Sequence, residues 1–464
     1  MPQRQAGVRI GYLMSWYPVV TETFILHEML ELRRLGVDLE LYPLFGAAHD
    51  VRHPGSEVLS PLVQRRARGP WSLLGAQLRW VLRRPKHYFR AWAGALVGNA
   101  RSPGFLLRAL IVVPLAAQMA ESMARRGITH VHAHFATHPT LAAHVVRELT
   151  GIGYSFTAHA HDLFMDRAML EGKIAAARRV VTISRFNRAL IERLFGPAAA
   201  AKTAVIPCGV NPRHFLERPR REPDGIFRVA CVAALRDYKG HRWLVDACAL
   251  LRERGVPFRC ALVGDGPERA RIEARVEAAG LRGWVELLGN QPHDRMRALL
   301  ARSDAMVLPS VVTASGMMDG IPVALMEAMA AGLPVVSTRV SGIPELVQDR
   351  RTGLLAPPGD AAALADALES LQRDPIWARR LAEAGRRHVL AHFNLQRNAV
   401  LLRDLLFAAA GQRGRAKAQG RKGIAGTLTG TSPEREESRE PGTQGRPPTL
   451  PAQLSAPSHP TTPR

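Results

Sequence analysis

Two acids and a glycine lie around the expected start of one helix in the second half of the chain. Asp319 and Glu327 are eight residues apart, and the residues between them begin with Gly320, Ile321, Pro322 and Val323. The N–H groups of a first helical turn lack partners within the helix, so together with the helix dipole they favour a bound diphosphate. Asp319 could then accept hydrogen bonds from an attached sugar, and Glu327 from ribose hydroxyls. The alternative is that Asp319 only caps the helix and Glu327 is a buried structural carboxylate.

One lysine has a position that suits a phosphate. Only six of the 63 basic residues are lysines, and Lys239 follows soon after an apolar segment that predicts a buried strand. An ammonium group in such a loop can bind a phosphate oxygen as a compact charge. The alternative is an ordinary surface lysine.

Histidines follow two predicted strands of the first half. His159 comes directly after an apolar segment, at what should be the C-terminal edge of a parallel sheet, where ligands bind in open α/β layers. His161 and Asp162 lie in the same loop. This spacing, and that of His132 and His134, would permit a metal site. We expect no metal, and we interpret His132 and His134 as packing or cleft-lining residues on one side of a strand.

The loop between the first predicted strand and the first predicted helix carries Glu22 and Thr23. In an α/β layer such a loop overhangs the ligand-binding edge, so Glu22 could position an acceptor or a phosphate. The alternative is that this segment only caps the helix through Thr21 or Thr23.

These residues lie on an α/β pattern that occurs twice. An apolar strand, a helix closed by Gly36 and an alternating strand begin the chain, which predicts a parallel sheet with right-handed crossovers. The same alternation restarts after a charged Pro/Gly connector. We predict two doubly wound, Rossmann-like domains. The expected parts are a first domain at 1–216 with a basic helical region at 64–127, a linker at 217–225, a second domain at 226–392, a last helix at 393–410 packing back towards the first domain, and a disordered tail at 411–464.

The segment from Asp319 to Val335 resembles the acid-x7-acid signature of glycosyltransferase family 4. Other motifs resemble that family in the same order: Tyr238-Lys239-Gly240, Gly264-Asp265-Gly266-Pro267, Leu308-Pro309-Ser310, Gly342-Ile343-Pro344-Glu345, Gly353-Leu354-Leu355 and Pro358-Gly359-Asp360. The first half resembles the branch that builds exopolysaccharides and colanic-acid-like polymers, at Trp16-Tyr17-Pro18, Thr21-Glu22-Thr23-Phe24-Ile25 and Phe156-Thr157-Ala158-His159. The resemblance spans about residues 8–408.

The resemblance implies the GT-B fold, in which two Rossmann-like domains face a central cleft, and a retaining transferase that needs no metal or other cofactor. It implies a nucleoside diphosphate sugar as donor. The implied catalytic residues are Asp319, His159 and Lys239. The implied donor-binding residues are Arg236, Lys239, Gly264, Gly266, Gly320, Ile321, Pro322, Val323 and Glu327, and those on the acceptor side are Glu22, Thr23, His161 and Asp162.

Two positions depart from the family pattern. Asp319 stands where the family usually has Glu, and Ala234 stands where it usually has a second phosphate-binding Arg. Arg236 follows two residues later, so in an extended strand its side chain would share a face with that of Ala234. We predict that Arg236 replaces the missing arginine.

The basic charge of the chain is concentrated in one region. The net charge is +23, ten basic residues lie between Arg65 and Arg108, and no acidic residue lies between Glu57 and Glu121. Aromatic residues interleave with these charges, which suits an anionic membrane surface; a solvated face over ordinary helices is the alternative. No nucleic-acid recognition motif accompanies the charge, so we expect no nucleic-acid partner.

The compartment is predicted from what the chain contains. The four cysteines show no CxxC pairing, which favours a reducing compartment, and the first residues show no apolar signal segment. The longest apolar stretch is interrupted by Arg108 and Pro114, so a multi-span membrane protein is not expected. We predict a cytoplasmic protein, peripheral at the inner face of the cytoplasmic membrane.

The predicted function is transfer of a sugar from a nucleoside diphosphate sugar to a glycan acceptor that is lipid-linked, in cell-surface or exopolysaccharide biosynthesis. Two alternatives remain open. One is a non-catalytic GT-B protein that binds sugar nucleotides or membranes within a polysaccharide assembly complex. The other is a GT-B nucleotide-sugar epimerase.

Overall fold

The computed structural model describes residues 7–18, 23–46, 55–64, 69–165, 167–215 and 224–419. For His161, His293 and residues 412–419 it describes the backbone alone. Residues 1–412 form one compact unit. Most of the predicted linker, and the predicted tail beyond Gln419, lie outside the described residues.

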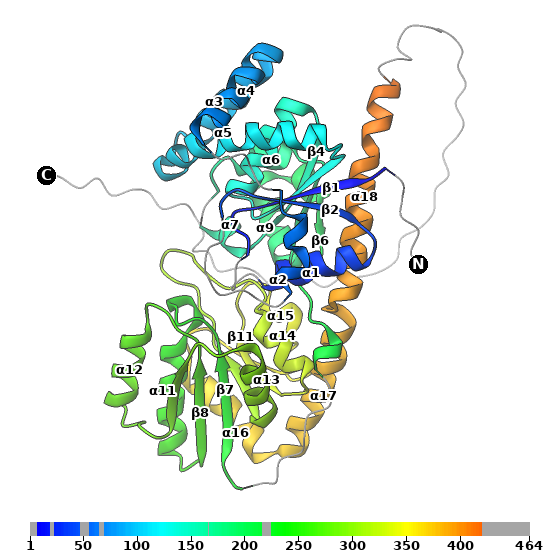
Figure 1. Cartoon of the computed structure of the whole chain (residues 1–464). Coiled ribbons are helices and arrows are strands. Elements are labelled where there is room, and N and C mark those ends of the chain that lie inside the picture. Colours follow the sequence, from blue (N-terminus) through cyan, green and yellow to red (C-terminus); the bar gives the residue numbers. More distant parts are fainter. Residues whose placement is uncertain are drawn as a thin grey trace, which may run out of the picture. The chain divides into compact units, whose positions relative to one another are not determined.

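The first half is built on a parallel sheet of six strands in the order β2-β1-β3-β4-β5-β6. The strands are β1 Arg9–Met14, β2 Asp38–Pro43, β3 His130–His134, β4 Gly153–Ala158, β5 Arg179–Thr182 and β6 Thr203–Val205. The helices are α1 Thr23–Arg34, α2 Ser56–Leu59, α3 Pro70–Arg83, α4 Pro85–Asn99, α5 Pro103–Arg125, α6 His138–Thr150, α7 Ala160–Phe164, α8 Leu170–Ala176, α9 Arg185–Phe195 and α10 Pro197–Ala201. Every residue of β3 and β4 is buried, as expected where helices cover both faces of a parallel sheet (Figure 1).

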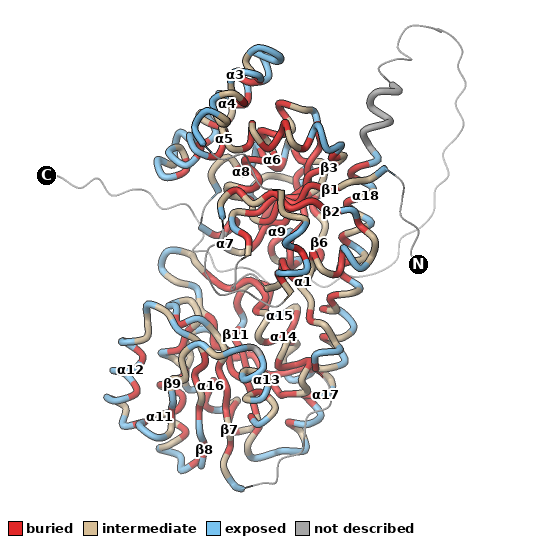
Figure 2. The backbone as a smooth tube through the Cα atoms, in the orientation of Figure 1, coloured by how far each residue is buried: buried red, intermediate tan, exposed pale blue. Residues whose placement is uncertain are grey.

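The second half repeats this design with the strand order β12-β11-β10-β7-β8-β9. Its strands are β7 Phe227–Val232, β8 Phe258–Val263, β9 Val285–Gly289, β10 Ala305–Leu308, β11 Val335–Thr338 and β12 Leu354–Ala356. Its helices are α11 His241–Glu253, α12 Arg269–Ala278, α13 His293–Arg302, α14 Val323–Ala330, α15 Ile343–Leu346, α16 Ala361–Arg373 and α17 Pro375–His392. Figure 2 shows that burial is concentrated on the strands of both sheets. The prediction of an α/β fold with two doubly wound layers is confirmed.

The last helix, α18 Leu395–Gln419, returns to the first half (Figure 1). Leu402 and Leu406 are fully buried and belong to the same apolar cluster as Ile10 and Tyr12 of β1. The helix continues to Gln419, whereas we predicted that disorder begins at residue 411. The residues from Gln412 to Gln419 include Arg, Ala, Lys and Gln, which are good helix formers, and they extend a helix that packing has already nucleated.

Helices α3, α4 and α5 are inserted between β2 and β3. Among the described residues, α5 is the single helix that is long and apolar enough to cross a membrane by length and composition. It buries Ala109, Val112, Val113 and Ala116 within the protein and packs along α6. A helix of this kind is also what a soluble core contains, so α5 by itself is weak evidence for a span.

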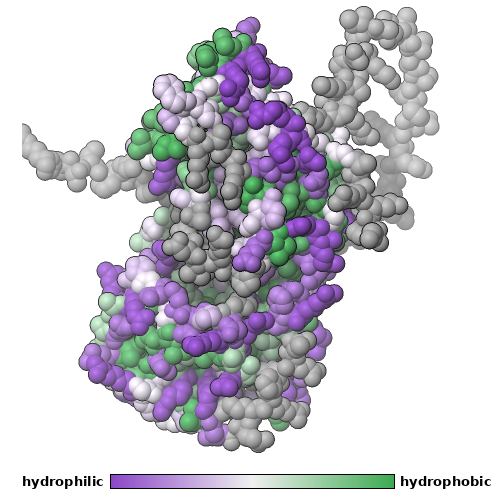
Figure 3. Space-filling model, in the orientation of Figure 1, coloured by the Kyte–Doolittle hydropathy of each residue, from purple (hydrophilic) through white to green (hydrophobic). Residues whose placement is uncertain are grey.

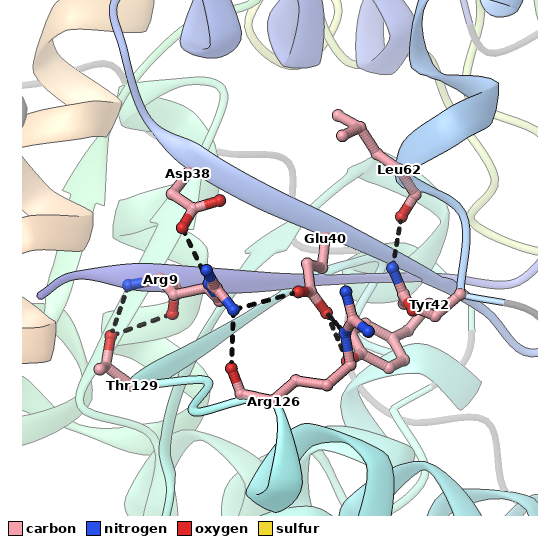
Figure 4. A network of polar contacts seen from close by, with 8 residues as sticks. Arg9, Asp38, Glu40, Tyr42, Leu62, Arg126 and Thr129 are labelled. Carbon is pink, nitrogen blue, oxygen red and sulfur yellow. Dashed lines mark hydrogen bonds and ion pairs between the residues drawn. The ribbon is translucent and has the colours of Figure 1, made fainter.

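A polar network connects the end of the inserted helices α3–α5 to the starts of strands β1 and β2 (Figure 4). Arg9 at the start of β1 donates to Asp38 of β2 at 2.8 Å and to the carbonyl oxygen of Arg126 at 2.9 Å. Arg126, which follows α5, donates in turn to the buried carboxylate of Glu40 at 2.6 Å. The network therefore fixes the return of the chain from α5 into β3, at the sheet edge opposite the one that carries the predicted site.

Candidate active site

An ion pair joins two of the predicted site residues. The Nζ atom of Lys239 donates to the Oδ1 atom of Asp319 at 2.6 Å, and Ser310 donates its hydroxyl to the other carboxylate oxygen, Oδ2, at 2.6 Å. Lys239 ends a short 3-10 helix, Asp237–Lys239, after β7, and Ser310 follows β10. Because β7 and β10 are parallel neighbours, their C-terminal ends meet at one edge of the sheet. Lys239 thus lies beside the residue that precedes Gly320, as the proposed diphosphate site requires.

Glycine is required where the Lys239 loop meets β10. Gly240 has a φ of +74°, and a Cβ atom there would lie 1.9 Å from the carbonyl oxygen of Pro309. Any side chain would push the loop away from the strand end, so this glycine sets the separation between Lys239 and the Asp319 segment.

The ion pair keeps the lysine charged in a largely buried place. Burial opposes the charged form of Lys239, but attraction and hydrogen bonding to Asp319 outweigh burial and raise the pKa of Lys239. Its ammonium group is therefore a permanent cation at neutral pH. A diphosphate could exchange with the Asp319 carboxylate as its partner.

Helix α14 starts beside this cation. The residue before its first turn is Pro322, and no side chain caps the helix, whereas Asp360 and Asp374 cap α16 and α17. The helix begins at Val323, so Glu327 lies little more than one turn from the start, not the two turns expected from counting at Gly320. Glu327 is half-buried on α14. Pro322 thus provides no side-chain acceptor for the first N–H groups of α14, which start next to Lys239.

Gly320 and Ile321 bring this segment against the first half. A Cβ atom on Gly320 would lie 2.8 Å from the Cδ1 atom of Ile183 and 3.4 Å from the Cβ atom of Ala160. Ile321 is buried, and a Cβ atom on Gly342 would lie 2.8 Å from its side chain. The approach to α14 is therefore tightly packed, and glycine at position 320 is needed for it.

The predicted glycine turn packs against the loop after β7. A Cβ atom on Gly264, whose φ is +135°, would lie 2.0 Å from the carbonyl oxygen of Ala233, and one on Gly266 would lie 2.4 Å from that of Leu235. These two glycines position the backbone that leads to Lys239. Their predicted contact with a donor stays a prediction.

Arg236 is not brought to the ion pair by the route we predicted. Strand β7 ends at Val232, and the N–H of Arg236 donates to the carbonyl of Ala234, so these two residues lie in a turn and not on one strand face. Arg236 is exposed and lines a pocket of about 520 Å³ together with Arg271 and Arg275. The residues that line this pocket do not include Lys239, Asp319 or Glu327. A phosphate contact by Arg236 stays a prediction.

The first half presents a histidine network at the C-terminal edge of its sheet. The Nε2 atom of His134 lies 2.8 Å from Oε1 of Glu28 and 2.7 Å from the hydroxyl of Tyr12, which itself donates to Glu28. The Nδ1 atom of His134 lies 3.2 Å from Nε2 of His159. His132 bonds Ser155 and Thr157 through its two ring nitrogens. His159, the predicted catalytic histidine, is therefore the outer member of a chain that begins at Glu28.

Charge and proton positions in this network follow from burial. Burial lowers the pKa of His159 to about 3 and that of His132 to about 3, so both rings are neutral at pH 7. Burial would raise the pKa of Glu28, but the neighbouring His134 outweighs burial and lowers it. We assign the His134 proton to Nε2, where it donates to Glu28, so that Nδ1 of His134 accepts the Nε2–H of His159. The Nδ1 atom of His159 is then a hydrogen-bond acceptor.

The acceptor-side residues are described only in part. Glu22 lies outside the described residues, and no side chain is described for His161. Thr23 begins α1. Asp162 is buried, and its Oδ2 atom accepts the backbone N–H groups of Ala136 and His159 at 2.9 Å each. The observed contacts of Asp162 thus fix the loops around His159, and a contact with an acceptor stays a prediction.

One group in the described part of the chain has a metal-like arrangement. Glu28, His132 and His134 place one ligand atom each within 4.8 Å of the others. All three are already engaged in hydrogen bonds with one another or with neighbouring hydroxyls, and two of them are fully buried. This group differs from the His159, His161 and Asp162 set that the sequence suggested. Hydrogen bonds within the protein engage all three side chains, and the expectation of no metal stays a prediction.

Sequence reasoning missed two residues that shape the site. Glu28 is separated from His134 by 106 positions, and the helical spacing of α1 alone did not show that its side chain faces the sheet edge. Glu345 accepts the backbone N–H groups of Arg185 and Phe186 at 2.9 and 2.8 Å, so a carboxylate of the second half caps α9 of the first. Glu345 belongs to a motif noted in the sequence, but the sequence did not show that it contacts the start of α9.

Two family models match the chain. Glycosyltransferase Family 4 matches residues 21–214, and Glycosyl transferases group 1 matches residues 213–388. The putative colanic acid biosynthesis glycosyltransferase WcaL of Escherichia coli K12 is 30% identical over 412 residues, which cover 84% of this chain and 97% of that protein. The amylovoran biosynthesis glycosyltransferase AmsK of Erwinia amylovora is 30% identical over 407 residues, which cover 83% of this chain and 96% of that protein.

Solved structures share the architecture. Sucrose-phosphate synthase from Thermosynechococcus elongatus superposes with a TM-score of 0.65 at 22% identity and covers 86% of this chain and 100% of that chain. HepE of Anabaena, solved in complex with UDP and glucose, superposes with a TM-score of 0.63 at 16% identity and covers 86% of this chain and 99% of that chain. These likenesses confirm the predicted GT-B fold. Together with the sequence matches, they lead to one conclusion: the chain belongs to glycosyltransferase family 4, in the branch of the colanic acid and amylovoran glycosyltransferases.

Proposed function

We propose that this glycosyltransferase moves a hexose from a nucleoside diphosphate sugar to a hydroxyl group of a glycan acceptor, with retention at the anomeric carbon, in the synthesis of a cell-surface or exopolysaccharide. The observation that carries the proposal is the 2.6 Å contact between Lys239 and Asp319 directly before the uncapped start of α14. A cation beside a helix start that its N-cap residue does not cap suits a diphosphate.

The donor would bind with its diphosphate between Lys239 and the first turn of α14. Glu327, one turn into the helix, would accept hydrogen bonds from the ribose hydroxyls. Asp319 would exchange its contact with Lys239 for hydroxyl groups of the sugar. Because both carboxylates are held on one short segment, the ribose and the sugar would be fixed on either side of the diphosphate.

Charge develops on the departing diphosphate as the bond between its oxygen and the anomeric carbon breaks. Lys239 and the dipole of α14 would stabilise that charge, which is the principal electrostatic task in such a reaction. The acceptor oxygen forms the new bond on the same face, and its proton passes to the leaving phosphate oxygen. Neutral His159 would accept a hydrogen bond from the sugar through Nδ1 and add no charge that competes with the developing oxocarbenium ion.

The acceptor and the location are further parts of the proposal. In this proposal the glycan acceptor is lipid-linked, and a cytoplasmic enzyme would meet such an acceptor at the inner face of the membrane. The basic α3–α5 region supports this placement.

A donor screen tests the proposal. Purified protein is mixed with a panel of nucleoside diphosphate sugars and acceptor glycans, and release of free nucleoside diphosphate is measured beside equilibrium binding. Lys239→Gln and Glu327→Gln should each weaken donor binding by at least about tenfold, since a charge-assisted hydrogen bond contributes about 1.5–3 kcal/mol. Lys202→Gln, which removes a lysine that donates to the carbonyl oxygens of Ala175 and Ala177, should bind as the parent does.

Two results would contradict the proposal. Unchanged donor binding in both site variants would show that the diphosphate binds elsewhere. Tight donor binding without release of nucleoside diphosphate from any donor and acceptor pair would favour a non-catalytic binding protein.

A further inference from the structure

Helix α3 carries apolar side chains on two opposite faces. Ala76 and Trp80 are buried, and the indole N–H of Trp80 donates to the carbonyl of Ala117 on α5 at 2.8 Å. The other face exposes a stripe that we call the α3 stripe: Trp71, Leu74, Leu78 and Leu82, with exposed fractions of 83%, 57%, 60% and 73%. Their spacing of three, four and four residues places all four on one side of a helix. Packing within the protein does not explain this exposed apolar face, so we look for an interaction partner.

The neighbouring helices add to this exposed apolar surface. Phe89 and Val97 on α4 and Leu107 and Ile111 on α5 are each more than half exposed. Both helices pack against each other and against α3. Figure 3 shows hydrophobic residues over this region beside strongly hydrophilic ones. Exposed apolar surface concentrated on one inserted subdomain marks an interaction site.

The charges around the stripe have one sign. Arg79 and Arg90 form ion pairs with Glu121 and Glu148, acids that belong to the packed helices α5 and α6. By contrast, Arg83, Lys86 and Arg101 are exposed and have no ion-pair partner among the described residues. No acidic residue lies on α3 or α4. The outer surface of this subdomain is therefore both apolar and positively charged.

We infer that α3–α5 docks on an anionic lipid bilayer, with the α3 stripe lying in the interface and the free cations against the lipid headgroups. A Trp and Leu face flanked by Arg and Lys is the composition of helices that lie in a bilayer interface. Charge decides against a second copy of the chain as the occupant. A symmetric dimer through this face would bring the same cations together without acids to neutralise them.

The inference extends the proposed function, because a lipid-linked acceptor would be held at the same surface. It also differs from a membrane span. Helix α5 buries ten residues within the protein and would have to leave α6 to cross a bilayer, whereas docking of α3 requires no change in the fold.

Vesicle flotation without donor or acceptor tests the inference independently of the enzymatic reaction. The full chain should float with vesicles of phosphatidylcholine mixed with phosphatidylglycerol and should not float with phosphatidylcholine alone. The triple variant Leu74→Gln, Leu78→Gln and Leu82→Gln should weaken binding by about 100-fold. Arg83→Gln, Lys86→Gln and Arg101→Gln together should weaken it by about tenfold and reduce its dependence on salt.

Matched controls lie on α17, away from the insertion. Ile376→Gln removes another exposed apolar side chain, 67% exposed, and Arg379→Gln with Arg380→Gln removes two exposed charges. Both controls should bind vesicles as the parent does. All positions are exposed, so circular dichroism and thermal unfolding should match the parent throughout.

Three results would overturn the inference. The parent could bind neutral and anionic vesicles equally, or the leucine variant could bind as well as the Ile376→Gln control. The parent could also be a dimer in solution that the leucine substitutions convert to monomer, which would make the stripe a contact between copies. Loss of vesicle binding with unchanged nucleoside diphosphate release from soluble acceptors would uphold the inference and separate it from the proposed reaction.

Discussion

The two sheets present opposite kinds of chemistry at their C-terminal edges. In the first half the edge carries histidines whose pKa burial lowers to about 3, so His132 and His159 are neutral and bonded to neighbours. In the second half the edge carries a cation, Lys239, whose pKa an adjacent carboxylate raises. Burial acts on both edges, but it prevails at His132 and His159, whereas the carboxylate of Asp319 outweighs it at Lys239.

The difference assigns different ligands to the two edges. A permanent cation beside an uncapped helix suits a diphosphate, and a rigid array of neutral donors and acceptors suits sugar hydroxyls. One edge would therefore bind the leaving group and the other the transferred sugar. Contacts such as that of Glu345 with the start of α9 hold the two edges against each other.

The proposed difference between the two edges is tested most directly by a substitution at Asp319. Asp319→Asn keeps the shape of the side chain but removes the charge that pairs with Lys239. Turnover should fall by about 100-fold, because hydrogen bonds from the sugar to a charged acceptor are lost. Binding of nucleoside diphosphate alone should tighten by a few fold, since the ammonium group no longer has a competing anion.

The control for this prediction is Asp366→Asn, which removes an exposed carboxylate of α16 that pairs with Arg254. It should change neither turnover nor binding. Calorimetry with nucleoside diphosphate and steady-state kinetics provide the two readouts. Weaker binding in Asp319→Asn would mean that Asp319 contributes to the diphosphate site and does not compete with it.

A second prediction concerns the place where the two halves meet. Gly320→Ala adds a Cβ atom 2.8 Å from Cδ1 of Ile183, so the segment before α14 must shift. Overpacking of this kind costs about 1–3 kcal/mol, and kcat/KM should fall by about tenfold. Ile183→Val removes exactly the clashing methyl group and should restore activity to Gly320→Ala. A loss that Ile183→Val fails to restore would place the effect in the backbone and not in packing between the halves.

The sequence predicted the order of elements and the parallel sheets. It placed Lys239 and Asp319 in one donor site, and the structure brings them together because strand ends in such sheets converge on one edge. It did not predict where strands and helices end. Strand β7 stops before Ala234, so the alternation argument for Arg236 does not apply. Helix α14 starts after Pro322, so Glu327 lies closer to the helix start than expected from a start at Gly320. Such boundaries depend on local turns that a hydrophobic pattern does not encode.

The site residues missed by sequence reasoning share one cause. Glu28 and Glu345 act on partners that are 106 and 159–160 positions away in the chain. Their side chains lie on helices whose rotation about their own axes is set by packing. A pattern of apolar residues predicts which face of a helix is buried, but not which single carboxylate at the margin of that face meets a polar group of another element.

A third prediction concerns the hydrogen-bond network of Glu28, His134 and His159. Glu28→Gln replaces an acceptor by a group that can also donate, so the proton on His134 is no longer fixed. Turnover should fall by several fold to about tenfold while donor binding stays unchanged, since the diphosphate contacts lie on the other edge. Nitrogen-15 NMR should find His159 as the Nε2–H tautomer in the parent and a mixture in Glu28→Gln.

Glu148→Gln is the matched control, because Glu148 is a buried carboxylate of the first half that pairs with Arg90 and Arg147 instead of a histidine. It should leave the NMR signal of His159 unchanged. An Nδ1–H tautomer of His159 in the parent would show that the direction of the hydrogen-bond chain is reversed.

The smallest effect is expected on stability as a function of pH. Burial lowers the pKa of His132 and His159 to about 3 and that of His144 to about 4, whereas the unfolded value is about 6.5. Between these values the unfolded chain binds protons that the folded chain does not. The stability that these neutral histidines contribute is therefore fully present above pH 6.5 and is lost as the pH falls towards 3. Each group contributes at most about 1.4 kcal/mol per pH unit.

Urea unfolding at pH 7 and pH 5 measures this loss. The second edge should not contribute to it through Lys239, because a raised lysine pKa gives stability that is present below pH 10 and lost only above it. His144→Leu removes one half-buried histidine, whose Nδ1 lies 3.5 Å from the hydroxyl of Tyr154, and should make the pH dependence shallower by up to one proton. Equal stability at both pH values would mean that the histidine network takes up protons without unfolding, and the contrast between a neutral and a charged edge would then hold only near pH 7.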